Sequence, residues 1–210
     1  MIAAHDPGMR APELTGAQRV TLLGVAAAAI ADVLQTGSAT PADTARHEPA
    51  LSEPGSTFVT LERDDELLGC IGTLEPVRAL VADVAHNAIA AAFSDPRLPA
   101  ITGREYEVMS IEISVLSALE PVGAASVDEL ANELRVGIDG VVVDAPGARA
   151  TFLPAVWRHF GDDVDTFLTS LWRKAGLAPG AWHSGTRCMR YTATKIADPG
   201  PRPGLGEMAR

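Results

Sequence analysis

The chain has 210 residues, of which 47% are hydrophobic and 5% are aromatic, and its formal net charge is −10. A chain of this length forms one domain, or one domain with a small lobe, and buries roughly 70% of its unfolded surface. The acidic balance repels a phosphate backbone and no run of Lys and Arg offsets it, so we expect no nucleic-acid partner.

The N-terminal residues 1–14 are predicted to be a flexible leader, because Pro7, Gly8 and Pro12 disfavour regular structure there. They lack the basic region followed by an apolar stretch that a signal peptide has. The longest apolar run, Val20–Ala31, is shorter than the about 20 residues that cross a bilayer. We therefore expect no membrane segment and a soluble, cytoplasmic protein.

Capping and alternation predict the elements of the first half. Thr15 and Gln18 have the spacing of a capping box and open a helix that runs to about Gln35. Residues 36–56 are rich in Pro, Ser, Thr and Gly and are predicted to be irregular. Residues 58–63 and 67–73 predict two strands of a hairpin, joined by a polar turn.

The next two elements are a helix and a strand. A helix is predicted to begin at Glu75-Pro76, because proline is favourable in a first turn, and to end at Asp95-Pro96. After a loop with Gly103 and Arg104, residues 108–116 alternate between apolar and polar side chains, which is typical of a strand.

The second half adds shorter elements. They are a helix from Ser126 to Leu134, a hairpin of 141–144 with 150–153, a turn of helix over 154–160, a helix over 164–175 and a strand over 187–195. Hairpins outnumber strand–helix–strand units, so the predicted class is α+β, with a mostly antiparallel or mixed sheet and helices packed on it. We predict one domain over residues 15–196 and a disordered Pro/Gly-rich tail over 197–210.

The two cysteines and the five histidines give little support for a disulfide or a metal site. Cys70 and Cys188 are expected to be reduced thiols, because two cysteines without a secretion signal rarely pair. The histidines are scattered, with no helical i, i+4 pair and no Cys-x-x-Cys motif. We predict no metal and no cofactor.

The segment Leu67–Thr73 carries the strongest candidate for a site. Gly69 and Gly72 flank Cys70, so bare backbone lies on either side of a thiol. In an extended strand Leu68, Cys70 and Gly72 share one face. On one reading Cys70 projects into a cleft, and on the other it is a small hydrophobe packed in a tight strand.

The polar residues of the strand over 108–116 are the nearest candidate partners for that thiol. Ser110, Glu112 and Ser114 share one face, which either faces solvent or lines the same cleft as Cys70. A carboxylate from Glu112 next to Cys70 would raise the pKa of the thiol, so a nucleophile would need a cation or an imidazole nearby. The candidates for that group are Arg104, Lys174, His159 and His183.

The order of the motifs resembles the AMMECR domain family, whose prokaryotic members are called AmmeMemoRadiSam system protein A. The motifs are Phe-Val-Thr-Leu at 58–61, Leu-Gly-Cys-Ile-Gly at 68–72, Asp-Pro-Arg at 95–97, Ile-Glu-Ile-Ser-Val-Leu-Ser at 111–117, Gly-Ile-Asp-Gly at 137–140, Phe-Leu-Pro at 152–154 and Lys-Ala-Gly-Leu at 174–177. Together they cover about residues 15–195.

This resemblance implies a single α+β domain with a larger and a smaller subdomain. It also implies a pathway shared with a Memo-like protein and a radical S-adenosylmethionine protein, and it names no substrate. Leu68 stands where the family usually has arginine, and Leu98 stands where it usually has phenylalanine. Without the arginine, the nearest expected cation for an anionic ligand or a thiolate is missing.

Two hypotheses about function follow. In the first, the chain is a binding or adaptor component with a pocket or peptide groove centred on Cys70. In the second, it is a hydrolase or transferase in which Cys70 is a nucleophile or an acid–base group and Glu112 and Ser114 orient the substrate. In either case the candidate ligand-binding residues are Gly69, Gly72, Thr73, Arg104 and Lys174. The partner is a protein, a peptide or a small molecule.

Overall fold

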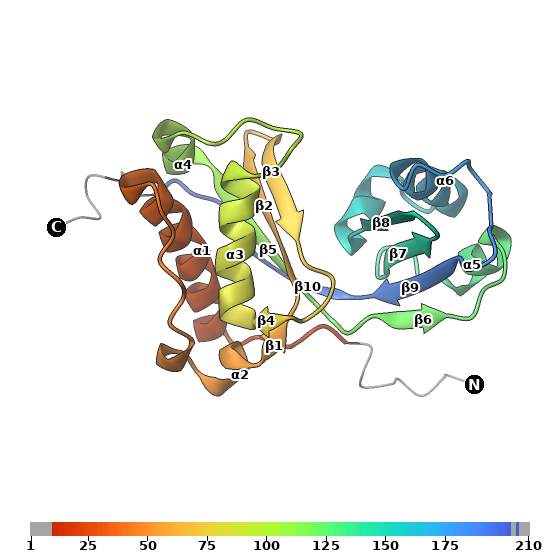
Figure 1. Cartoon of the computed structure of the whole chain (residues 1–210), viewed down its shortest axis with the longest axis horizontal. Coiled ribbons are helices and arrows are strands. Elements are labelled where there is room, and N and C mark those ends of the chain that lie inside the picture. The colour runs from red at the N-terminus through yellow and green to blue at the C-terminus, as the bar shows by residue number, and fades with distance from the viewer. Residues whose placement is uncertain (1–9, 203–204, 206–210) are drawn as a thin grey trace. The chain divides into compact units, whose positions relative to one another are not determined.

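The computed structural model describes residues 10–202 and 205, which form two compact units (Figure 1). Within the described residues, the large unit comprises 12–116, 194–202 and 205, and the small unit comprises 10–11 and 117–193. Each unit has its own four-stranded sheet and its own buried cluster of hydrophobic side chains. The α+β class is confirmed.

The sheet of the large unit has the strand order β10-β5-β2-β3. Its strands are β2 (Thr57–Arg63), β3 (Glu66–Gly72), β5 (Ser110–Leu116) and β10 (Ala193–Asp198). The central strand β2 is antiparallel to β3 and to β5, and β3 is an edge strand. Asp64 and Asp65 have positive φ angles of 49° and 64° at the tip of the β2–β3 hairpin, as a tight primed turn requires.

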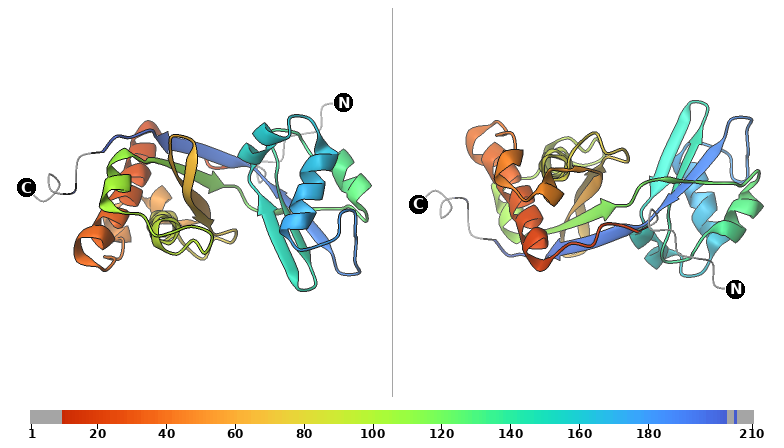
Figure 2. Two further views of the ribbon diagram at one scale, coloured as in Figure 1. Left: turned by 90° about the horizontal axis from the view of Figure 1, so that it is seen from above. Right: turned by 90° about the horizontal axis from the view of Figure 1, so that it is seen from below.

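Helices α1 (Gly16–Thr36) and α3 (Leu80–Phe93) pack against one face of this sheet (Figure 1), and Figure 2 shows α1 in red and orange beside it. The predicted capping box at the start of α1 is present, because Thr15 Oγ1 accepts from Gln18 N while Gln18 Oε1 accepts from Thr15 N. By length and composition α1 could cross a membrane, and no other helix in the described residues could. Its inner residues Leu22, Ala26 and Ile30 are fully buried.

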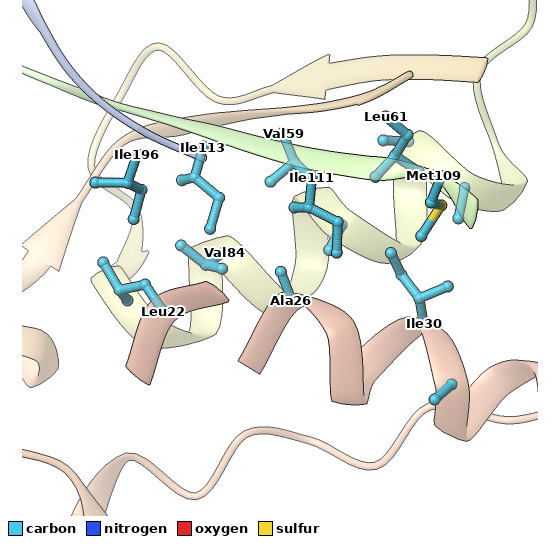
Figure 3. Close-up of a cluster of buried hydrophobic side chains, with 14 of the residues drawn as sticks. Leu22, Ala26, Ile30, Val59, Leu61, Val84, Met109, Ile111, Ile113 and Ile196 are labelled. Atoms are coloured by element: carbon cyan, nitrogen blue, oxygen red, sulfur yellow. The ribbon is translucent and has the colours of Figure 1, made fainter. Parts of the chain in front are cut away.

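The core of the large unit lies between these helices and the sheet (Figure 3). Its central side chains come from α1, α3, three strands and the residue before β5. They are Leu22, Ala26, Ile30, Val59, Leu61, Val84, Met109, Ile111, Ile113 and Ile196. Alternation along β2 and β5 sends these apolar residues to the helices and sends Thr60 and Glu112 to the opposite face.

The predicted start of the second helix at Glu75-Pro76 is wrong. Arg78 and Ala79 form β4, which pairs with β1 (Pro54–Gly55), and the amide of Leu80, the first residue of α3, donates to Glu53 O. The irregular segment before β1 also contains two short helices, η2 (Thr44–Arg46) and α2 (Pro49–Ser52). Pairing with this segment therefore sets where α3 starts.

Two further boundaries differ from the prediction. Residues expected to be a loop form helix α4 (Gly103–Val108), opened by a capping box of Thr102 and Glu105, so β5 begins only at Ser110. The single strand predicted over 187–195 is two strands, β9 (Arg187–Tyr191) and β10, which belong to different sheets.

The small unit has the strand order β6-β9-β7-β8. The strands other than β9 are β6 (Glu120–Val122), β7 (Gly140–Ala145) and β8 (Ala148–Phe152), and the helices are α5 (Val127–Glu133), η3 (Pro154–His159) and α6 (Val164–Lys174). The predicted hairpin of 141–144 with 150–153 is confirmed as β7 and β8. The rings of Trp157 and Phe167 stack with their centroids 3.7 Å apart in this core.

The predicted C-terminal tail is attached to the large unit through Arg202. Arg202 N donates to Glu107 O, and its guanidinium donates to Met109 O and pairs with Asp198 at 2.7 Å. Leu205 O accepts from Gln35 Nε2. Residues 203–204 and 206–210, like residues 1–9 of the predicted leader, lie outside the described residues.

Candidate functional site

The strand that carries Cys70 contains a β-bulge. Leu61 is opposite Gly69 and Glu62 is opposite Leu67, so Leu68 is an extra residue in β3. Leu68 is 9% exposed and belongs to the buried cluster that includes Val59 and Ala91. The expectation that Leu68 shares a face with Cys70 is therefore wrong, because the bulge turns this side chain into the core.

The two glycines beside Cys70 make room for atoms of this chain itself. A Cβ at Gly69 would lie 1.9 Å from Ala91 O in α3, and a Cβ at Gly72 would lie 2.1 Å from Cγ of Phe58. Gly69 thus lets α3 approach the sheet, and Gly72 lets the Phe58 ring lie across the edge strand. The space that was expected to admit a ligand at these glycines is taken by the helix backbone and by the Phe58 ring.

Cys70 lies in a row of polar side chains that crosses the sheet on the face opposite the helices. The register places Thr60 opposite both Cys70 and Glu112, and the Thr60 hydroxyl donates to Cys70 Sγ at 3.3 Å. At the far end Lys195 Nζ pairs with Glu112. The row therefore runs Cys70, Thr60, Glu112 and Lys195, with one residue from each of the four strands.

The predicted catalytic residues share this face but do not touch one another. Two strand spacings, about 10 Å, separate Cys70 from Glu112, because Thr60 lies between them. Lys195 pairs with Glu112 and balances its charge, so the negative charge of the carboxylate reaches the thiol together with the positive charge of the lysine. Ser114 is opposite Phe58, in the next row of the face, and is only 4% exposed.

The backbone of Cys70 is held by the Asp-Pro-Arg motif. Asp95 Oδ2 accepts from Cys70 N at 3.0 Å, and Arg97 Nη2 donates to Cys70 O at 3.1 Å. The same guanidinium bonds both carboxylate oxygens of Asp95, at 2.9 and 2.6 Å. These bonds from Arg97, followed by the Cys70 amide, outweigh burial and hold the pKa of Asp95 well below its usual range.

The sequence predicts that a helix ends at Asp95-Pro96, next to Arg97, and it does not predict the contact of Arg97 with Cys70. The positive charge of Arg97 also interacts electrostatically with Cys70, which raises the pKa of the guanidinium after the larger effects of Asp95. Arg97 thus supplies the cation whose absence at position 68 was expected to matter. Thr60 and Lys195 were missed as well, because only strand register brings them into the row.

The comparisons with known proteins agree with the order of motifs. The family model AMMECR1 matches residues 23–196. The chain belongs to the AMMECR1 family. A relative from Thermofilum pendens is 39% identical over 165 residues, which cover 73% of this chain and 78% of the relative. One from Methanocaldococcus jannaschii is 34% identical over 154 residues, covering 72% and 77%.

A solved structure has the same fold. The crystal structure of the uncharacterised protein PH0010 from Pyrococcus horikoshii has a TM-score of 0.79 and 32% identity to this chain. The match covers 86% of this AMMECR1-family chain and 91% of PH0010. The family and the fold are thereby shown.

Thr73, a predicted ligand-binding residue, belongs to a buried polar cluster of the large unit. Its hydroxyl lies 3.2 Å from Asn87 Nδ2 and 3.5 Å from Arg78 Nη1. Asp83 is the centre of the cluster: it is fully buried, accepts from Thr57 and Asn87, and pairs with Arg78 at 2.7 Å. The partners that fix Thr73 are therefore side chains of this protein.

The two predicted cationic ligand-binding residues lie outside the row. Lys174 is in the small unit, where its Nζ donates to Thr151 O and lies 5.2 Å from the centroid of the Phe152 ring. Arg104 is exposed on α4. Across the part of the chain that the structure describes, no three His, Cys, Asp or Glu side chains gather closely enough to hold a metal ion.

The two thiols are expected to differ strongly in reactivity towards iodoacetamide in the native protein. Cys70 is half-buried, whereas Cys188 is 2% exposed in the small unit, and burial raises its pKa to about 12. Mass spectrometry after native labelling should find Cys70 modified and Cys188 protected until the protein is unfolded. Equal rates at the two sites would contradict this assignment of exposure.

The variant Leu68→Arg is the informative companion in that experiment. Because Leu68 points to the core side of the sheet, an arginine there does not add a charge to the face that carries Cys70. The Cys70 labelling rate should stay at the wild-type value, while Arg97→Gln, which removes the guanidinium beside Cys70, should slow it. A faster reaction in a Leu68→Arg protein that keeps the wild-type circular dichroism spectrum would place that side chain on the Cys70 face.

Proposed function

We propose that this AMMECR1-family protein is an accessory binding component, and that it binds its partner through the helix-free face of the large unit's sheet, centred on Cys70. The observation that carries the proposal is the row of Cys70, Thr60, Glu112 and Lys195, to which every strand contributes one side chain. The proposed partners are the Memo-like and radical S-adenosylmethionine proteins, and the family resemblance supports this pathway.

The character of this face supports recognition of a protein or peptide. Antiparallel sheets commonly pack one face on a core and present the other, and α1 and α3 both lie on the other side of this sheet (Figure 1). Thr60, Cys70 and Glu112 are half-buried, and Phe58 adds an aromatic ring beside Gly72. Rigid strands thus present hydroxyl, thiol and aromatic groups together, as protein-binding surfaces do.

The charges on and beside the row balance. Lys195 pairs with Glu112, and Arg97 pairs with Asp95 behind Cys70. A surface of balanced charge favours a partner with neutral polar groups over a polyanion, in agreement with the net charge of −10 on the whole chain.

Reversing one charge in the row is the direct test. In Glu112→Lys the new ammonium faces Lys195, so binding of the purified Memo-like protein, measured by isothermal titration calorimetry, should weaken by at least about tenfold. Glu107→Lys is the matched control, because it makes the same charge change on an exposed residue of α4. Equal weakening by both variants, or by neither, would refute the proposed surface.

The second hypothesis, an enzyme that uses Cys70, is favoured by the polar groups around the thiol. The Thr60 hydroxyl donates to Cys70 Sγ, and the Arg97 guanidinium donates to the backbone carbonyl of Cys70. Cys70→Ser separates the two functions: intact partner binding with lost turnover supports an enzyme. Weakened binding, with no turnover in either protein, supports the binding component.

A further inference from the structure

The composition and the position of strand β3 favour unwanted pairing with another strand. Strand β3 is an edge strand of its sheet, and after Glu66 its residues Leu67–Gly72 are uncharged and contain no proline. An uncharged edge strand presents unpaired amide and carbonyl groups to any other extended chain. A second copy of the same strand meets no charge repulsion there, and two identical edges can pair about a twofold axis.

The side chains of Asp95 and Arg97 occupy the position that a neighbouring strand would take at Cys70. A pairing strand offers a carbonyl oxygen to an edge amide and an amide to an edge carbonyl. Here Asp95 Oδ2 accepts from Cys70 N at 3.0 Å and Arg97 Nη2 donates to Cys70 O at 3.1 Å. The two side chains are tied to each other, so they act as one clamp that imitates a strand.

Asp95, one member of the clamp, is buried, whereas Arg97, the other member, is accessible to solvent. The side chain of Asp95 is 1% exposed, whereas that of Arg97 is 55% exposed. The β-bulge at Leu68 disrupts the regular strand just before the clamp. Bulges are a second common feature that keeps edge strands from pairing with other chains. The clamp thus protects the middle of the strand, and the bulge protects its beginning.

We infer that the Asp95–Arg97 clamp keeps the β3 edge from pairing with the β3 edge of a second copy of this chain. The inference stands on the strand order and the bonds to the Cys70 backbone, and it is independent of the proposed function. The Asp-Pro-Arg motif thereby prevents association of the protein through the β3 edge.

The test is the association state of Arg97→Ala, followed by sedimentation equilibrium over a range of protein concentrations. We expect this variant to associate more than the wild type at the same concentration, with the weight-average mass moving towards twice the starting value. Arg104→Ala is the matched control, since it removes the same charge from an exposed residue of the same unit, and it should sediment like the wild type.

Two additional measurements connect association to the edge. Leu67→Lys in the Arg97→Ala background should reduce the association, because a lysine on an exposed edge strand disfavours pairing with another strand. Amide hydrogen exchange should show Gly72 protected in the associated form of Arg97→Ala, because the amides of Cys70 and Gly72 face the free edge while those of Ile71 and Thr73 face β2. If Arg97→Ala and Asp95→Ala both keep the wild-type circular dichroism spectrum and the wild-type mass at every concentration, the inference is overturned.

Discussion

Gly69→Ala is expected to destabilise the large unit by about 3 kcal/mol, the upper end of the usual cost of overpacking, because the atoms that the new methyl group meets cannot move away by themselves. The added Cβ would lie 1.9 Å from Ala91 O and 2.8 Å from Ala91 C, and both atoms are backbone of α3. A flexible side chain could move away from such a contact, but here the helix must shift from the sheet. The measurement is denaturant unfolding followed by circular dichroism.

Gly24→Ala is the matched control for this substitution. Gly24 lies inside α1, is exposed, and has no atom within 4 Å of the added Cβ. Alanine is a better helix former than glycine, so this variant should be more stable by about 0.5–1 kcal/mol. The same substitution is thus expected to have opposite signs at the two sites, and destabilisation of similar size at both would contradict the role given to Gly69.

The tryptophans make the two units separately observable in this experiment. Trp157, Trp172 and Trp182 all lie in the small unit, and the large unit has none. Tryptophan fluorescence therefore reports unfolding of the small unit, while circular dichroism reports both units. In Gly69→Ala the circular dichroism transition should move to lower denaturant even where the fluorescence transition does not.

Elements with strong local signals could be predicted from the sequence. Thr15 and Gln18 predict the start of α1, and Ser126 predicts the start of α5, because a capping side chain bonds to the backbone within the first turn of its own helix. Thr102 and Glu105 carried the same signal for α4, and the glycine between them obscured it. Short-range chemistry was therefore sufficient for these helix starts.

Elements set by distant partners could not be predicted. The start of α3 depends on pairing between β4 and β1, about 24 residues apart in the chain. The residues from 187 to 198 look like one continuous strand locally, but β9 pairs with β7 while β10 belongs to the sheet with β5. In both cases long-range hydrogen bonding overrides the local pattern.

The sequence predicted which side chains alternate along each strand of the candidate site, but it did not predict the contacts that these side chains make. Alternation separated Glu112 from Ile111 and Ile113, since the side-chain period of a strand is two, but whether its face also carries Cys70 stayed open until the register placed both opposite Thr60. The bulge at Leu68 shifts that period by one residue and leaves no mark in the sequence. Arg97 reaches Cys70 across 27 positions of the chain, a contact that only the tertiary fold specifies.

Asp83→Ala is the second substitution with a large expected effect, a loss of about 3–5 kcal/mol, which is typical when one member of a buried ionic network is removed. Asp83 Oδ2 accepts from Thr57 N at 2.9 Å, from Thr57 Oγ1 at 2.8 Å and from Asn87 Nδ2 at 2.9 Å. Its other oxygen pairs with Arg78. Alanine would leave several of these donors unsatisfied in a fully buried position.

Arg78→Ala separates the ion pair from the rest of the cluster. The Arg78 side chain is 35% exposed, so water can partly replace it, and Asp83 keeps its bonds to Thr57 and Asn87. We therefore expect Arg78→Ala to cost clearly less than Asp83→Ala in the same unfolding measurement. The reverse order would mean that Asp83 stabilises the unit mainly through the charge of Arg78, and that its attachment of α3 to the start of β2 contributes little.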